Sequence, residues 1–163
     1  MTNSAKALTQ YQPPSEQQLR DATAVVERFA QHWQRPVAED LRDLMHPDTQ
    51  NLIPPMTVPA DREGVVDHFR EVLQRLPDLK VEVMRWAPTG DAVLIEWRAH
   101  ASVAGERLAW QGVDRFNLRG ERMYQGQVYW DTRRVAEQFA DAARRAQERG
   151  ASTAFAVAAG AGS

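Results

Sequence analysis

The spacing of apolar residues changes once along the chain, from a helical repeat to a strand repeat. Up to Pro77, apolar residues recur every three or four positions, the spacing of one helix face. Ser15-Glu-Gln-Gln18 forms a capping box that opens the first helix, and Pro36 ends it. The inner face of this helix is predicted to carry Leu19, Ala22, Val26, Phe29 and Trp33.

Two further helices are predicted before Pro77. A short one has Leu41 and Leu44 on its inner face and stops at His46-Pro47. Residues 47–60 contain four prolines, so we expect irregular structure there, with residues 52–53 as a candidate short strand. Asp61 then caps a longer helix. Its apolar face comprises Val65, Phe69, Val72 and Leu76.

After Pro77, apolar and polar residues alternate, which predicts strands. Glycine-containing turns separate four of them, over residues 79–86, 91–102, 107–118 and 122–130. The connections are short, so neighbouring strands should pair and the sheet order should follow the chain. Asp131 or Thr132 caps a final helix, whose apolar stripe is Val135, Phe139, Ala142 and Ala146. Three helices followed by an antiparallel meander belong to the α+β class.

The two ends of the chain carry no such pattern. Residues 1–14 lack an apolar period, and residues 151–163 are mostly alanine, glycine and serine. We expect a disordered arm and a disordered tail, respectively. Residues 15–150 contain neither a linker nor an internal repeat, and they are predicted to form a single domain.

Composition and charge narrow the class of function. The chain has 163 residues, a formal charge of −2 and no cysteine, which excludes a disulfide scaffold and a cysteine nucleophile. Metal-ligand spacing and a glycine-rich phosphate loop are missing, so neither a metal nor a cofactor is expected. The near-neutral charge argues against nucleic acid. The chain has neither a long apolar run nor a signal-peptide pattern. We therefore expect no membrane association and a cytoplasmic location.

A polar cluster is predicted on one face of the two longest strands. If the Ala104-Gly105 turn is a tight hairpin, paired residue numbers sum to about 210. Glu96 then faces Asp114, and His100 faces Trp110. Glu96, Arg98, His100 and Asp114 would share this face with the aromatic residues Trp110, Phe116 and Trp130. An apolar wall with a few convergent polar groups is typical of a small-molecule pocket.

The alternative is that this polar face is simply solvated. Val93, Ile95 and Trp97 would then form the core instead. A slip of one residue in the pairing exchanges the two faces of the strand. If paired residue numbers sum to about 210, an apolar stripe lies on the outer face of the sheet, where it would form a homodimer interface. That stripe consists of Val93, Ile95, Trp97, Ala99 and Ala101.

Three motifs carry a resemblance to a known fold. They are Leu76-Pro-Asp-Leu-Lys-Val-Glu-Val83, Gly112-Val-Asp-Arg-Phe116 followed by Arg119-Gly120, and Val128-Tyr-Trp-Asp131. With the helix and strand order, they resemble the nuclear transport factor two-like cone over most of residues 20–140. Ketosteroid isomerase, limonene-epoxide hydrolase and the SnoaL-like polyketide cyclases share this fold. The resemblance implies a curved antiparallel sheet packed on three N-terminal helices, with an extra C-terminal helix.

The functional residues of these relatives are only partly present. Asp114 falls where ketosteroid isomerase has its protonated oxyanion-hole aspartate, whereas Phe29 replaces the oxyanion tyrosine and Ile53 lies near the position of the base. Arg98 and His100 fall at the arginine and first aspartate of the limonene-epoxide hydrolase triad. The second aspartate falls at Val128. The resemblance therefore implies a cavity but does not specify a reaction.

The candidate catalytic residues are His100, Asp114 and Arg98. His100 is the expected general acid or base, because histidine titrates near neutral pH. Arg98 would hold a developing negative charge. Asp114 would either orient His100 or, if burial raises its pKa, donate a proton. Substrate-binding residues are expected to be Trp110, Phe116, Trp130, Phe29, Trp33, Met56 and Glu96.

The sequence thus favours a cofactor-independent acid–base enzyme for a hydrophobic, oxygenated metabolite such as a polyketide or terpenoid. Cyclisation, isomerisation, dehydration and epoxide opening all fit such a site. Two alternatives remain. One is a non-catalytic protein that binds a small molecule in the same cavity, and the other is a dimeric assembly protein of the same fold.

Overall fold

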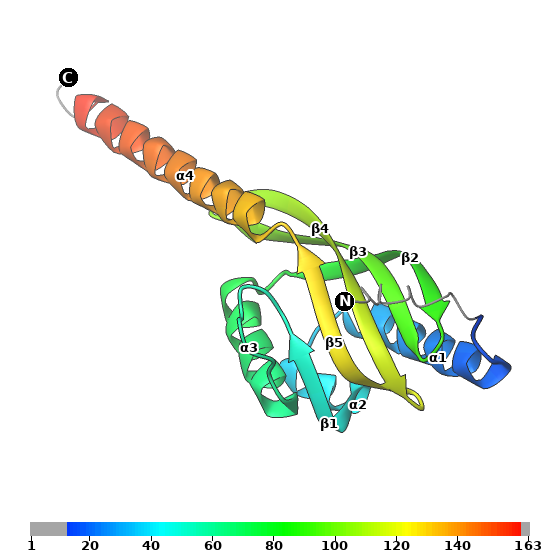
Figure 1. The fold of residues 1–163 in the computed structure, drawn as a ribbon. Helices are drawn as coiled ribbons and strands as arrows, with labels where there is room; N and C mark the ends of the chain where they lie inside the picture. The colour runs from blue at the N-terminus through cyan, green and yellow to red at the C-terminus, as the bar shows by residue number, and fades with distance from the viewer. Residues whose placement is uncertain (1–12, 161–163) are drawn as a thin grey trace, which may run out of the picture.

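The computed structural model describes residues 13–160 and has the predicted α+β architecture (Figure 1). Helices cover one face of a five-stranded sheet that is not closed into a barrel. The elements are α1 (Glu16–His32), the 3-10 helix η1 (Ala38–Asp40), α2 (Leu41–Leu44), β1 (Met45–Leu52), α3 (Arg62–Arg75), β2 (Lys80–Thr89), β3 (Ala92–Val103), β4 (Glu106–Arg119), β5 (Arg122–Trp130) and α4 (Thr132–Gly160).

The long helices begin at the predicted capping residues. The Ser15 hydroxyl accepts from the Gln18 amide at 3.2 Å, and the Gln18 side chain accepts from the Ser15 amide at 2.8 Å. Asp61 caps α3 by accepting from the Gly64 amide at 2.8 Å. Of the two candidates for α4, Asp131 is the cap, since its Oδ1 accepts from the Arg134 amide at 2.9 Å. Each cap satisfies a backbone donor that the helix leaves free.

The sheet has the strand order β1-β5-β4-β3-β2. The four predicted strands form the antiparallel meander β2 to β5, as expected. β1 was not predicted as a strand apart from Leu52, its last residue, which lies in the candidate short strand at residues 52–53. It runs parallel to β5 at the edge of the sheet. Pro47 lies in the part of β1 where the register shifts, between Met45 and Gln50. An edge strand tolerates a proline there, because no neighbour needs its missing N–H.

The pairing of β3 and β4 differs by one residue from the predicted register. Ile95 pairs with Asp114 and Trp97 pairs with Gly112, so paired numbers sum to 209. The cause is the two-residue turn at Ala104 and Gly105, whose φ angles are +50° and +81°. Positive φ at both turn residues is the geometry of the tightest hairpins. The predicted sum of 210 is therefore wrong.

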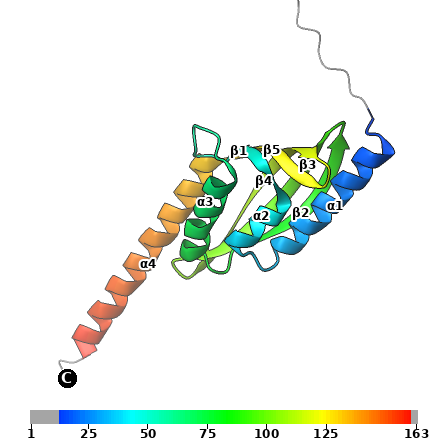
Figure 2. The same ribbon diagram turned by 90° about the horizontal axis from the view of Figure 1, so that it is seen from below.

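This register decides which side chains meet the helices. Val93, Ile95, Trp97, Ala99 and Ala101 lie on the inner face of the sheet, and each is at most 7% exposed. Figure 2 shows α1, α2 and α3 crossing that face. The stripe predicted for the homodimer interface is instead part of the core. The outer face carries Glu96, Arg98 and His100.

The C-terminal helix continues further than the sequence predicted. α4 runs from Thr132 to Gly160 and extends away from the sheet (Figure 1). The helix therefore includes residues 151–160, which we expected to be disordered. Its first turns bury Val135 and Ala142. Residues 1–12 and 161–163, the rest of the predicted arm and tail, lie outside the described residues.

Candidate functional site

A cavity of about 630 Å³ lies between the helices and the inner face of the sheet. This volume is within the usual range for small-molecule sites. Its wall is mostly apolar, and it reaches the surface at Pro55 and Arg75, which are exposed. The lining residues are Phe29, Trp33, Ile53, Pro54, Pro55, Met56, His68, Phe69, Val72, Arg75, Leu76, Leu79, Val81, Trp97, Ala99, Val103, Trp110, Asp114, Val128, Trp130, Val135 and Phe139.

Asp114 is the one carboxylic acid among these lining residues of the described chain. It projects from β4 and is 6% exposed. Burial raises the pKa of its carboxyl from 3.8 to about 7, against the opposing effect of a hydrogen bond from Trp97. Near neutral pH the group is then divided between its protonated and ionised forms. Such a carboxyl can both give and accept a proton at working pH.

Trp97 holds Asp114 in place from the neighbouring strand. Its indole Nε1 donates to Asp114 Oδ1 at 2.8 Å. The indole reaches that oxygen by crossing β4 over Gly112, where an added Cβ would lie 2.4 Å from Trp97 Cζ2. A side chain at position 112 would displace the ring. This role of Trp97 was not predicted from the sequence, although a glycine inside a strand often marks such a close approach.

Six of the predicted site residues line the cavity. Asp114, Trp110, Trp130, Phe29, Trp33 and Met56 all contribute to its wall. Phe116 lies on the same inner face but belongs to the core beside the cavity, where its ring centroid is 6.1 Å from that of Phe29.

Glu96, Arg98 and His100 do not reach the cavity. The register of β3 places them on the outer face of the sheet, opposite Asp114. There Glu96 pairs with Arg85 at 2.8 Å, and Arg98 is exposed. The predicted cluster of His100, Arg98 and Asp114 is therefore not formed, and the reason is the one-residue difference in register.

Two basic side chains that the prediction left out line the cavity from α3. His68 is half-buried there. Burial lowers its pKa, and the nearby Arg75 lowers it further. His68 is therefore neutral at neutral pH, and Arg75 carries the charge on this wall. The signal in the sequence is their spacing of seven residues, two helical turns along one face.

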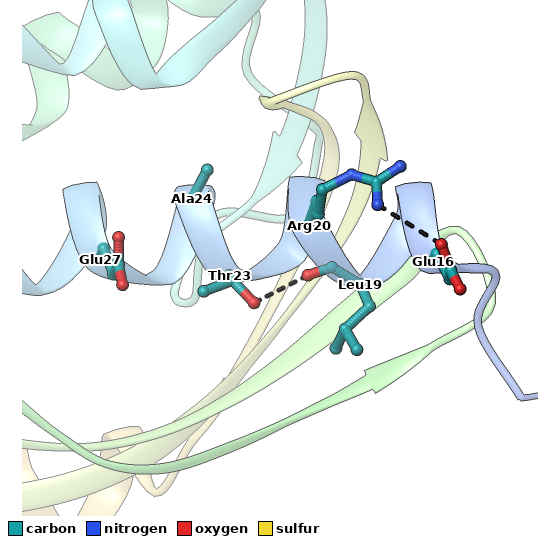
Figure 3. A pocket seen from close by; sticks show the side chains of 6 residues that line it. All are labelled: Glu16, Leu19, Arg20, Thr23, Ala24 and Glu27. Carbon is teal, nitrogen blue, oxygen red and sulfur yellow. Dashed lines mark hydrogen bonds and ion pairs between the residues drawn. The ribbon is translucent and has the colours of Figure 1, made fainter.

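A second depression follows the outer side of α1 (Figure 3). All of its lining residues come from that single helix, and two pairs of them interact with each other. Arg20 lies 3.7 Å from Glu16, and the Thr23 hydroxyl donates to the Leu19 carbonyl at 2.8 Å. The cavity around Asp114 is therefore the candidate site.

Residues 13–160 carry neither a metal-binding cluster nor a membrane-spanning helix. No group of three or more histidine, aspartate or glutamate side chains there is arranged to hold a metal ion. None of the helices in that range is long and apolar enough to cross a membrane.

Comparison with solved structures shows the fold. A proposed polyketide cyclase from Acidithiobacillus ferrooxidans superposes with a TM-score of 0.66 at 18% identity, over 75% of this chain and 96% of that one. A proposed polyketide cyclase from Bacillus cereus superposes with a TM-score of 0.68 at 13% identity, over 82% of this chain and 95% of that one. AclR, a proposed hydroxylase from Streptomyces galilaeus, superposes with a TM-score of 0.65 at 15% identity, over 75% of this chain and 97% of that one.

The family is identified by comparing the sequence with models of known protein families. No curated protein matches it. The profile of the SnoaL-like domain family matches residues 26–126, from the middle of α1 into β5. This range contains Trp97, Gly112 and Asp114, together with the inner faces of β2, β3 and β4. The chain belongs to the SnoaL-like domain family.

Proposed function

We propose that this protein is an acid–base enzyme that acts on a hydrophobic, oxygenated small molecule such as a polyketide or terpenoid. The observation that carries the proposal is a buried carboxyl, Asp114, with a pKa of about 7 in the wall of an apolar cavity. Perturbed groups in clefts are typical of catalytic sites. The chemistry is proton transfer, as in cyclisation, isomerisation, dehydration or epoxide opening, and it requires no cofactor.

Asp114 would act through the oxygen that Trp97 does not bind. Oδ1 already accepts the indole N–H, so Oδ2 is the oxygen free to exchange a proton with the substrate. In its ionised form, Asp114 removes a proton from a carbon next to a carbonyl group. In its protonated form, it returns that proton to carbon or oxygen. The aromatic wall formed by Trp33, Trp110 and Trp130 holds the substrate and excludes water.

A non-catalytic binding protein is the second candidate. It is favoured by the location of the three predicted catalytic residues, of which only Asp114 lines the cavity. A single buried carboxyl can also serve to bind a ligand hydroxyl or carbonyl. Activity separates the two candidates, because both predict that apolar ligands bind.

The test uses 5-nitrobenzisoxazole, an aromatic probe that opens when a base removes its single acidic C–H proton. We expect the wild-type rate to rise with pH through about 7, as Asp114 ionises. Asp114→Asn should lower the rate by about 100-fold. Glu96→Gln makes the same carboxyl-to-amide change on the outer face and should keep the wild-type rate.

Two results would contradict the acid–base proposal. One is an Asp114→Asn variant with the wild-type rate. The other is a wild-type protein that binds the neutral dye N-phenyl-1-naphthylamine but does not accelerate the reaction. The second result would leave the binding protein as the better candidate.

A further inference from the structure

One face of α3 forms a wall of the cavity and brings a permanent positive charge to it. The residues of this face are His68, Phe69, Val72, Arg75 and Leu76. Phe69 packs into the aromatic wall, with its ring centroid 5.2 Å from that of Trp33. Arg75 lies in the last turn of α3, where the cavity reaches the surface. It is the only lining side chain of the described residues that stays charged at every working pH.

Arg75 differs from its arginine neighbours on the same helix. Arg70 pairs with Glu39 at 2.9 Å, and Arg62 lies 3.7 Å from Glu63. Within residues 13–160, no carboxylate is within 4.0 Å of the Arg75 guanidinium. Its Nε donates to the backbone carbonyl of Glu71, over a long 3.4 Å. The remaining guanidinium donors are therefore available to a ligand.

The other polar groups of the cavity offset the charge of Arg75 only in part. Burial keeps much of Asp114 protonated at neutral pH, because its pKa is raised to about 7, so the carboxyl compensates Arg75 only in part. His68 is neutral and can add a hydrogen bond. Glu71 also contributes to the field at His68, but its own side chain is exposed and does not line the cavity.

We propose that the ligand of this cavity is an amphipathic anion, with a carboxylate, sulfate or phosphate bound by Arg75 and a hydrophobic body among the tryptophans. This inference rests on the proposed function only in that both use the same cavity. Arg75 is exposed, so the anion keeps part of its hydration and avoids most of the cost of burying a charge. Guanidinium groups bind such oxyanions through two parallel hydrogen bonds.

The experiment compares two dyes with the same anilinonaphthalene skeleton. One is 8-anilinonaphthalene-1-sulfonate, which carries a permanent negative charge, and the other is neutral N-phenyl-1-naphthylamine. Both are titrated into the full-length protein, and quenching of tryptophan emission reports binding, because Trp33, Trp97, Trp110 and Trp130 line the cavity. The variants are Arg75→Gln and the matched control Arg85→Gln, which removes the same charge from the outer face of the sheet.

We expect Arg75→Gln to weaken binding of the sulfonate dye about five-fold or more and binding of the neutral dye less than two-fold. Arg85→Gln should change neither affinity by more than about two-fold. Unchanged sulfonate binding in Arg75→Gln, or equal weakening of both dyes, would overturn the inference while leaving the cavity as a binding site. Failure of both dyes to bind the wild type would overturn the inference together with the cavity's role as a ligand site.

Discussion

The indole N–H of Trp97 donates to Oδ1 of Asp114 at 2.8 Å, and this hydrogen bond joins the centres of β3 and β4 inside the cavity wall. Two opposing effects act on the pKa of this carboxyl. Burial favours its neutral form, and the indole donor favours its ionised form. The balance places its pKa at about 7. Trp97 therefore orients Asp114 and holds the pKa of its carboxyl below the value that burial alone would give.

Replacing the indole donor should move the pH profile upward. Trp97→Phe keeps an aromatic ring but removes the N–H, so the pKa of Asp114 should rise by about one unit. The pH dependence of the 5-nitrobenzisoxazole reaction measures this shift. Trp110→Phe is the matched control, because Trp110 also lines the cavity. A change in rate with no displacement of the profile would mean that Trp97 acts only through packing.

The elements were easier to predict from the sequence than their register. Alternation of apolar and polar residues identified β2 to β5, because one face of each strand is buried. The register depended on the geometry of the turn between β3 and β4. That geometry could not be predicted from Ala104, because alanine rarely adopts a positive φ. The one-residue difference moved Trp97 to the face of Asp114 and moved His100 away from it.

Most of β1 escaped prediction because two of its three buried residues, Thr49 and Asn51, are polar. Thr49 and Asn51 are 0% and 3% exposed. They satisfy each other through a hydrogen bond from Asn51 Nδ2 to Thr49 Oγ1 at 3.0 Å. Hydrophobic patterning cannot reveal such a strand. His68 and Arg75 escaped for a related reason, because they adjoin the apolar stripe of α3 and look like ordinary surface residues.

Gly112 should be intolerant of any side chain. An added Cβ would lie 2.4 Å from the Trp97 ring and 2.7 Å from the Tyr129 carbonyl oxygen. We expect Gly112→Ala to lower the free energy of unfolding by about 1–3 kcal/mol, as other overpacked sites do. Urea denaturation measures the change. Gly150→Ala is the control, since no atom lies within 4 Å of its added Cβ. The free energy of unfolding of this variant should stay the same or increase. Equal effects of the two substitutions would exclude the close approach.

The outer face of the sheet remains our proposed homodimer interface, although the predicted stripe is not on it. Tyr129 is 55% exposed there and pairs with Val113, while Leu94 is 38% exposed on β3. We expect light scattering to give a dimer mass for the wild type and a monomer mass for Tyr129→Glu. Leu19→Glu, at a position of α1 that is 44% exposed, is the matched control and should remain dimeric. A monomeric wild type at micromolar concentration would refute the interface.

The pKa of Asp114 should also be visible in the stability of the protein. The carboxyl has a pKa of about 7 in the folded protein against 3.8 for an unperturbed aspartate, so between these values the folded form holds a proton that the unfolded form has lost. Stability from this group is therefore fully present below about pH 4 and declines as pH rises to about 7. The difference between the two pKa values corresponds to about 4 kcal/mol.

Asp114→Asn isolates this contribution. The other ionisable groups titrate alike in both proteins, so their effects cancel when the two free energies of unfolding are subtracted. We expect the wild type to lose about 3 kcal/mol relative to Asp114→Asn between pH 4 and pH 7, where most of this change falls, measured by urea denaturation at each pH. A difference that stays constant over this range would mean that the carboxyl is ionised in the folded protein. Asp114 could then no longer donate a proton near neutral pH.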